Sequence, residues 1–141
     1  MRFALMISGL ALLAACGVPS RVDTPPVVAQ VVTRSISPVA SDVLTARSYY
    51  NIYDDRIWVE ERPGAVCVAE NRQQRVEFTT PANVALASFG PIPATDGLDL
   101  SCTYDGETVT RYIPCFVSGG LDPNCRFGGG IDVTFNAPPR E

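Results

Sequence analysis

The sequence predicts an all-β fold: a small antiparallel β-sandwich, stapled by disulfides, that follows a signal segment and a flexible tether. Short segments alternate apolar and polar residues, which is the period of a strand with one buried face. No window of useful length repeats its apolar residues every 3.6 positions, so we expect few helices. Four cysteines beyond the N-terminal segment form an even set, as in exported proteins with disulfides.

Residues 1–15 have the features of a signal peptide. Arg2 precedes an apolar run that is too short to cross a bilayer as a helix. This run leads into Leu13-Ala14-Ala15-Cys16, which resembles the lipobox of bacterial lipoproteins. The resemblance implies cleavage before Cys16 and acylation of that cysteine, and two or more acyl chains anchor a protein stably. The alternatives are a secretory peptide without lipid and an N-terminal helix.

The resemblance also predicts a location. Position 17 is Gly rather than Asp, which under the sorting rule of some bacterial lipoproteins favours the outer membrane, facing the periplasm. We therefore expect the chain in the bacterial cell envelope, bound to the membrane through the lipid at Cys16.

Residues 16–48 are expected to form the tether, with part of it ordered at most. Its three prolines before residue 27 favour extended backbone. The β-branched stretch at 27–36 is either an edge strand or an unpaired extension. A short helix is expected over Pro38 to Arg47, because proline suits the first turn of a helix.

The β-domain is expected over residues 49–141. Alternation and turn residues predict strands at 57–60, 65–69, 76–79, 84–89, 98–102, 108–113 and 131–135. Asp105-Gly106 separates two of these strands and predicts a two-residue hairpin turn of type I′. Ile57 and Val59 are expected to face the core, with Trp58 on the opposite face.

Cysteine counting predicts two disulfides. With Cys16 set aside, Cys67, Cys102, Cys115 and Cys125 allow three connectivities, of which we favour Cys67–Cys102 and Cys115–Cys125. A zinc site is the rival, but the spacing has no Cys-x-x-Cys pair and the chain has no histidine. We therefore expect no metal.

One part of the chain resembles a known family. The motifs that carry the resemblance are Pro63-Gly64-Ala65-x-Cys67, Val76-x-Phe78-Thr79-Thr80-Pro81 and Leu98-x-Leu100-x-Cys102. Their order is similar to that of the PEGA-like β-domains of bacterial envelope lipoproteins, over about residues 56–105. The resemblance implies a small surface or periplasmic β-sandwich without enzyme activity.

Composition argues against several function classes. All 11 basic residues are arginines and the net charge is −4, so no cationic surface for nucleic acid is expected. Without His or Lys, the usual general base and Schiff-base amine are missing. The three glycines at 128–130 lack the order of a phosphate-binding loop. Asp96, Asp99 and Asp105 lack EF-hand spacing. We expect no cofactor and no catalytic residue.

Aromatic residues give the better functional hypothesis. Trp58, with Tyr49 and Tyr53, is a candidate binding surface for glycan or a protein partner, because aromatic residues are enriched at binding sites. The alternative, which we favour, is that Trp58 packs under the N-terminal segment.

The expected function is that of a non-enzymatic envelope lipoprotein. Its β-domain would serve a structural, binding or assembly role in the periplasm, with an envelope protein or peptidoglycan as partner. The alternatives are an inhibitor or accessory protein of a cell-envelope hydrolase, in which the 115–125 loop inserts, and an enzyme that uses acidic residues on cell-wall glycan.

Overall fold

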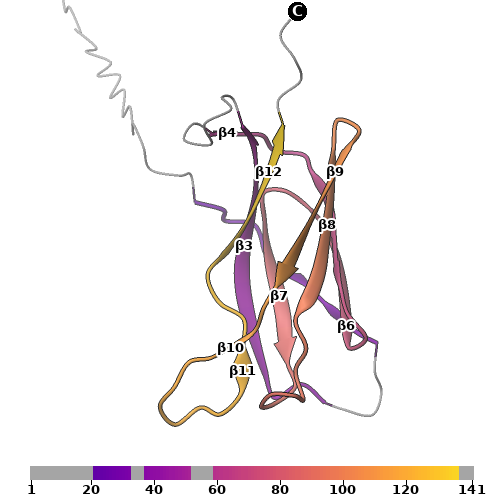
Figure 1. Cartoon of the computed structure of the whole chain (residues 1–141). Helices are drawn as coiled ribbons and strands as arrows, with labels where there is room; N and C mark the ends of the chain where they lie inside the picture. Colours follow the sequence, from indigo (N-terminus) through magenta and orange to yellow (C-terminus); the bar gives the residue numbers. More distant parts are fainter. Residues whose placement is uncertain (1–20, 33–36, 52–58, 137–141) are drawn as a thin grey trace, which may run out of the picture.

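The computed structural model describes residues 21–32, 37–51 and 59–136, which form a sandwich of two β-sheets (Figure 1). The strands are β1 (Val27–Val28), β2 (Gln30–Val31), β3 (Ala40–Asn51), β4 (Val59–Glu61), β5 (Val66–Glu70), β6 (Gln74–Thr79), β7 (Ala82–Ser88), β8 (Leu98–Tyr104), β9 (Glu107–Ile113), β10 (Phe116–Val117), β11 (Cys125–Arg126) and β12 (Gly130–Asn136). None of the described residues forms a helix long and apolar enough to cross a membrane.

The strands divide into two layers and a small hairpin. One sheet has the order β1-β7-β3-β12, with β4 paired to the far end of β3. The other has the order β2-β6-β5-β8-β9. The short strands β10 and β11 pair only with each other. The all-β, disulfide-stapled sandwich expected from the sequence is confirmed.

Most of the strand pairs are antiparallel, but two are parallel. Strand β12 runs parallel to β3, and β1 runs parallel to β7. A parallel pair needs a long crossover connection, and here the connection from β3 to β12 includes four of the five strands of the second sheet: β5, β6, β8 and β9. The alternating pattern of residues 131–135 predicts the strand but not its partner.

The core lies between the two sheets. Each sheet contributes large side chains with 2% exposure or less: Leu44, Leu86, Val133 and Phe135 from the first sheet, Leu98 and Leu100 from the second. Along β6 and β12, every second residue is buried and the residues between them are exposed or half-buried, as expected for strands with one face on the core.

Strand β3 corrects one expectation from the sequence. The helix expected over Pro38 to Arg47 was wrong, because β3 occupies Ala40–Asn51. Leu44, Ala46 and Ser48 face the core with the residues between them on the other face. Pairing with β7 on one side and β12 on the other outweighs the local preference of Pro38 for a first helical turn.

The ordered domain also begins earlier in the chain than residue 49, where we expected it to begin. Strands β1, β2 and most of β3 lie within residues 16–48, where we expected the tether. Within the described part of the stretch at 27–36, the edge-strand alternative is the one observed, since β1 and β2 both pair. The Asn83 amide also donates hydrogen bonds to the carbonyl oxygens of Val22 (2.9 Å) and Thr24 (3.0 Å).

One side of the sandwich is closed by the chain itself. Strand β1 pairs with β7 in one sheet and β2 pairs with β6 in the other, and buried Ala29 lies between them. Next to this crossing, the fully buried Gln74 joins the sheets. Its Nε2 donates to Ala87 O and its Oε1 accepts from Ala87 N, both at 2.8 Å. Gln73 and Gln74 are buried although they lie in a polar stretch of the sequence, Asn71-Arg72-Gln73-Gln74.

The two disulfides have the expected connectivity. Cys67 and Cys102 are directly opposite on β5 and β8, with Cα atoms 4.1 Å apart and no exposure to solvent. Cys115 and Cys125 close the hairpin of β10 and β11, with Cα atoms 5.4 Å apart. The turn at Asp105-Gly106 is also as expected, because both residues have positive φ (49° and 81°).

The Gln74 amide generates a stability prediction. Replacing Gln74 with Leu leaves the N–H and C=O of Ala87 buried without their partner, which should lower the free energy of unfolding by about 2–4 kcal/mol. Urea unfolding measures this. Gln30→Leu is the matched control, because Gln30 is exposed on the neighbouring β2 and its loss should cost less than about 0.5 kcal/mol. Equal costs at the two positions would contradict the role given to Gln74.

The disulfides generate a second prediction. Loop closure gives about 3.8 kcal/mol for the Cys67–Cys102 bond and about 2.8 kcal/mol for the Cys115–Cys125 bond. Replacing Cys67 and Cys102 together with Ala should therefore lower the urea midpoint more than replacing Cys115 and Cys125. Burial of the first pair in the core adds to the difference. A larger loss from the second pair would show that the hairpin controls folding.

Candidate binding groove

The side of the sandwich opposite β1 and β2 is open. Here β9 is the last strand of one sheet and β12 the last strand of the other. Near the end of β12 the strands are bridged, because the Glu107 carboxylate accepts hydrogen bonds from Asn136 N (3.1 Å) and Asn136 Nδ2 (3.3 Å). Beyond this bridge, towards the glycine loop at 128–130, a groove lies between the two strands.

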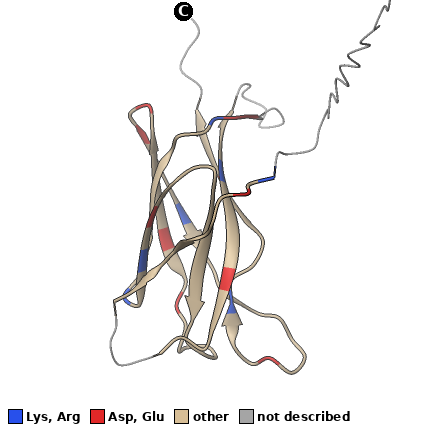
Figure 2. Ribbon diagram, turned by 180° about the vertical axis from the view of Figure 1, so that it is seen from behind, with Lys and Arg blue, Asp and Glu red and all other residues tan. Residues whose placement is uncertain are grey.

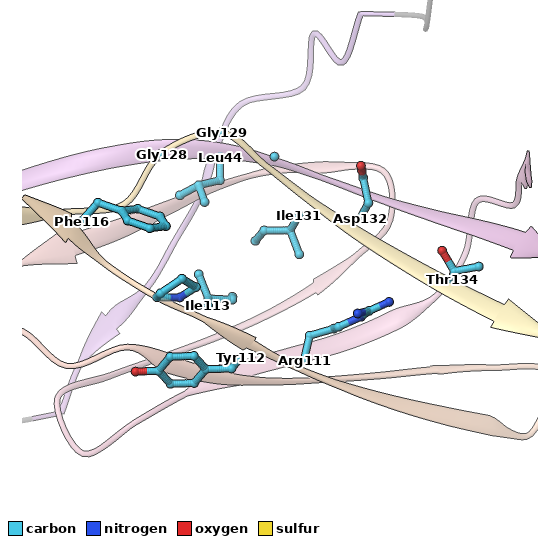
Figure 3. A pocket seen from close by; sticks show the side chains of 12 residues that line it. Leu44, Arg111, Tyr112, Ile113, Phe116, Gly128, Gly129, Ile131, Asp132 and Thr134 are labelled. Atoms are coloured by element: carbon cyan, nitrogen blue, oxygen red, sulfur yellow. The ribbon is translucent and has the colours of Figure 1, made fainter. Parts of the chain in front are cut away.

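The groove has an apolar end and a polar end (Figure 3). Its volume is about 470 Å³. Leu44, Ile113 and Ile131 line its middle, and Phe116 lies at the end next to the glycine loop. The opposite end is lined by Arg111, Asp132 and Thr134. Such a groove fits an extended chain with apolar and polar side chains rather than a compact ligand.

Arg111 differs from the other arginines that the structure describes. Arg21, Arg47, Arg62, Arg72, Arg75 and Arg126 each form an ion pair with a carboxylate. Arg111 has no ion-pair partner among the described residues, although it lies on the same face of β9 as buried Ile113. Elsewhere, acidic and basic residues alternate along the ribbon and are spread over both sheets (Figure 2).

The stapled hairpin lies at one end of the groove. It comprises the Cys115–Cys125 disulfide with β10, β11 and the loop between them, and it projects from the sandwich in Figure 1. Three of its apolar side chains are exposed: Phe116 at 57%, Val117 at 49% and Leu121 completely. Exposed apolar side chains so close together are typical of an interaction site.

Charged contacts fix the base of the hairpin. The Arg126 guanidinium donates to both carboxylate oxygens of Asp42, at 2.7 Å to Oδ1, and to Asp122 Oδ2 at 3.1 Å. These hydrogen bonds, above all those to Asp42, raise the pKa of Arg126. The pKa of Asp122 is lowered, mainly by the hydrogen bond from Asn124 N and also by Arg126. The apolar tip is therefore presented on a well-fixed base.

The predicted aromatic surface is only partly described. Tyr49 is half-buried on the outer face of β3, and burial, followed by the charges of Asp132 and Glu61, raises its pKa. Tyr50 lies on the other face, where its ring meets that of Tyr104 edge-on at 5.4 Å. Trp58 and Tyr53, with Ile57, lie outside the described residues, as does the lipidation residue Cys16. The side chain of Val59 is not described either.

Two features of this region were missed in the sequence. Arg111 was included only as part of an alternating strand, although the same alternation places it beside Ile113 on the face towards the other sheet. Phe116 and Leu121 were recognised only as part of a stapled loop. Within the described ranges, no group of three or more His, Cys, Asp or Glu side chains gathers as a metal site would require.

Comparison of the chain with protein-family models, with curated proteins and with solved structures gave no match. The functional argument therefore rests on the chain itself.

Proposed function

We propose that this chain is a non-enzymatic envelope lipoprotein that presents its β-domain for a binding or assembly role in the periplasm. One observation carries the proposal. With Cys16 assigned to the lipobox order Leu13-Ala14-Ala15-Cys16, the four other cysteines of the chain all pair with each other. Disulfides persist in oxidising compartments, which fits an exported and anchored domain. In this proposal the lipid holds the domain at the outer membrane, facing the periplasm.

The groove and the hairpin support a binding role. Both lie on the open side of the sandwich, where apolar side chains such as Phe116 line one end of the groove and the cation of Arg111 lines the other. An extended segment of an envelope protein is a suitable partner, since its apolar side chains can fill the groove while its acidic or polar groups meet Arg111. Peptidoglycan remains the other candidate partner, through the aromatic residues Trp58, Tyr49 and Tyr53.

The PEGA-like resemblance is part of the same proposal. Its two cysteine strands correspond to β5 and β8, which lie side by side in one sheet, and its middle segment includes β6. The arrangement of these strands is compatible with a small envelope sandwich of that kind.

The lipid anchor has a direct test. Cys16→Ser removes the acyl acceptor, so the protein should move from the membrane fraction to the soluble fraction and lose incorporation of a labelled fatty acid. Replacing Cys115 and Cys125 together with Ser is the control, because it changes two cysteines but leaves the lipobox intact. That variant should stay in the membrane. A Cys16→Ser protein that remains membrane-bound at the wild-type level would rule out the anchor.

The exposed hairpin favours a second function: inhibition or assistance of a cell-envelope hydrolase. Inhibitory loops are fixed at the base and exposed at the tip, because a rigid loop loses little entropy on binding. The hairpin has both properties, with Arg126 joined to Asp42 at the base and Leu121 fully exposed. Leu121 would be the inserting side chain.

The substitution Leu121→Ser distinguishes the two functions, because only inhibition requires the Leu121 side chain for capture of the partner. If the hairpin inserts into a hydrolase, wild-type protein should capture one dominant hydrolase from solubilised envelope, and Leu121→Ser should reduce capture at least about tenfold. Its free energy of unfolding should change by less than about 0.5 kcal/mol, since the side chain is exposed. Val66→Ser, at an exposed position on β5, is the control. Capture of assembly proteins or peptidoglycan, unaffected by Leu121→Ser, would exclude inhibition and leave the first function.

A further inference from the structure

The outer edge of β9 has unpaired backbone groups. No described strand pairs with this edge, which ends the sheet beside β8 (Figure 1). Tyr104 and Glu107 flank the two-residue turn and form a bonded pair, and bonded and non-bonded pairs then alternate along β8 and β9. Thr108, Thr110 and Tyr112 therefore direct their N–H and C=O groups away from β8, towards the free edge.

The sequence of β9 is symmetric about Val109. It reads Glu107-Thr108-Val109-Thr110-Arg111, with the same residue on both sides of Val109 and opposite charges at the two ends. Two such strands that run antiparallel about Val109 place Thr108 opposite Thr110 and Glu107 opposite Arg111. Threonine pairs and opposite-charge pairs are both favourable across antiparallel strands.

The backbone pattern agrees with this register. The bonded pairs across the new edge would be Thr108 with Thr110, whose backbone groups are the ones that face outward. The non-bonded pairs would be Val109 with Val109 and Glu107 with Arg111, and side chains come closest in non-bonded pairs. A one-residue shift of the register loses the charge pairing, so the symmetry and the hydrogen-bond pattern select the same alignment.

We infer that the free edge of β9 binds the β9 strand of a second copy of this chain. The two strands pair antiparallel about Val109 and join the five-stranded sheets of the two copies into one sheet. Arg111, which has no ion-pair partner among the described residues, is paired with Glu107 of the second copy. Val109, which is half-buried in the single chain, is covered by its equivalent.

Charge complementarity distinguishes a second copy from a foreign strand. An inward-pointing charge on an edge strand normally prevents pairing, because a partner strand would bury the charge without a counter-ion. By strand alternation Arg111 lies on the core-side face of β9 with Val109 and Ile113, although its side chain is exposed in the single chain. Pairing about Val109 supplies that counter-ion from the chain's own sequence, and the same charge disfavours strands that lack an acid at the matching position.

Light scattering on the full-length chain in mild detergent tests the inference. The wild type should have the protein mass of a dimer, and Arg111→Glu should reduce it to that of a monomer by placing two acids opposite each other. Exchanging the charges in Glu107→Arg with Arg111→Glu should restore the dimer. Arg75→Glu is the control: it makes the same charge change on β6 of the same sheet, and should leave the dimer intact.

Cysteine cross-linking tests the register independently. Thr108→Cys and Thr110→Cys lie on the sheet face away from the core, so they should not exchange with the buried Cys67–Cys102 bond. Under mild oxidation, co-expressed chains with Thr108→Cys in one and Thr110→Cys in the other should form a covalent dimer. Either variant alone should form at least about tenfold less.

Three results would overturn the inference. They are a monomeric wild type at the highest soluble concentration, a dimer that Arg111→Glu leaves intact, and a charge exchange that fails to restore dimers. Free-thiol titration and thermal melts of each variant show that the fold is retained. Arg111→Glu is the more informative single variant, because Glu107 also accepts hydrogen bonds from Asn136 within its own chain.

Discussion

The buried amide of Gln74 is the interaction on which the difference between the two sides of the sandwich depends. It satisfies both backbone groups of Ala87 in the other sheet, where a continuous ladder between β6 and β7 is absent. The short strands β1 and β2 then cover the sheet edges on the same side. Because that side is sealed by polar groups that satisfy each other, the groove lies on the opposite side, between β9 and β12.

Much of this fold follows from the period of the sequence. The strands around Cys67, Phe78, Leu100 and Ile131 all alternate, and each lies with its apolar residues on the core. The hairpin at residues 105–106 follows from turn chemistry, since Gly and Asp tolerate positive φ. The cysteine count left three disulfide pairings open, and the structure confirms the favoured one, since Cys67 and Cys102 lie opposite each other on β5 and β8.

Other parts could not be predicted because they depend on distant partners. Residues 40–48 form a strand rather than a helix because they pair with β7 and β12, which lie more than 30 residues away in the sequence. Gln74 is buried because it bonds to the backbone C=O and N–H of Ala87 in the other sheet. A glutamine in a polar stretch of sequence does not predict such a contact. Arg111 is different: strand alternation placed it on an inward face, but its significance needed the position of the open edge. Trp58, the main functional candidate from the sequence, lies outside the described residues.

The connectivity of the disulfides has a consequence for biogenesis. Each bond joins cysteines that are consecutive among the four, Cys67 with Cys102 and then Cys115 with Cys125. A chain that enters an oxidising compartment with its N-terminus first exposes the first pair before either member of the second. Oxidation in order of arrival then produces both native bonds, and no wrong bond has to be broken and remade. For a chain that enters such a compartment, this connectivity needs oxidation of the thiols but no rearrangement of disulfides.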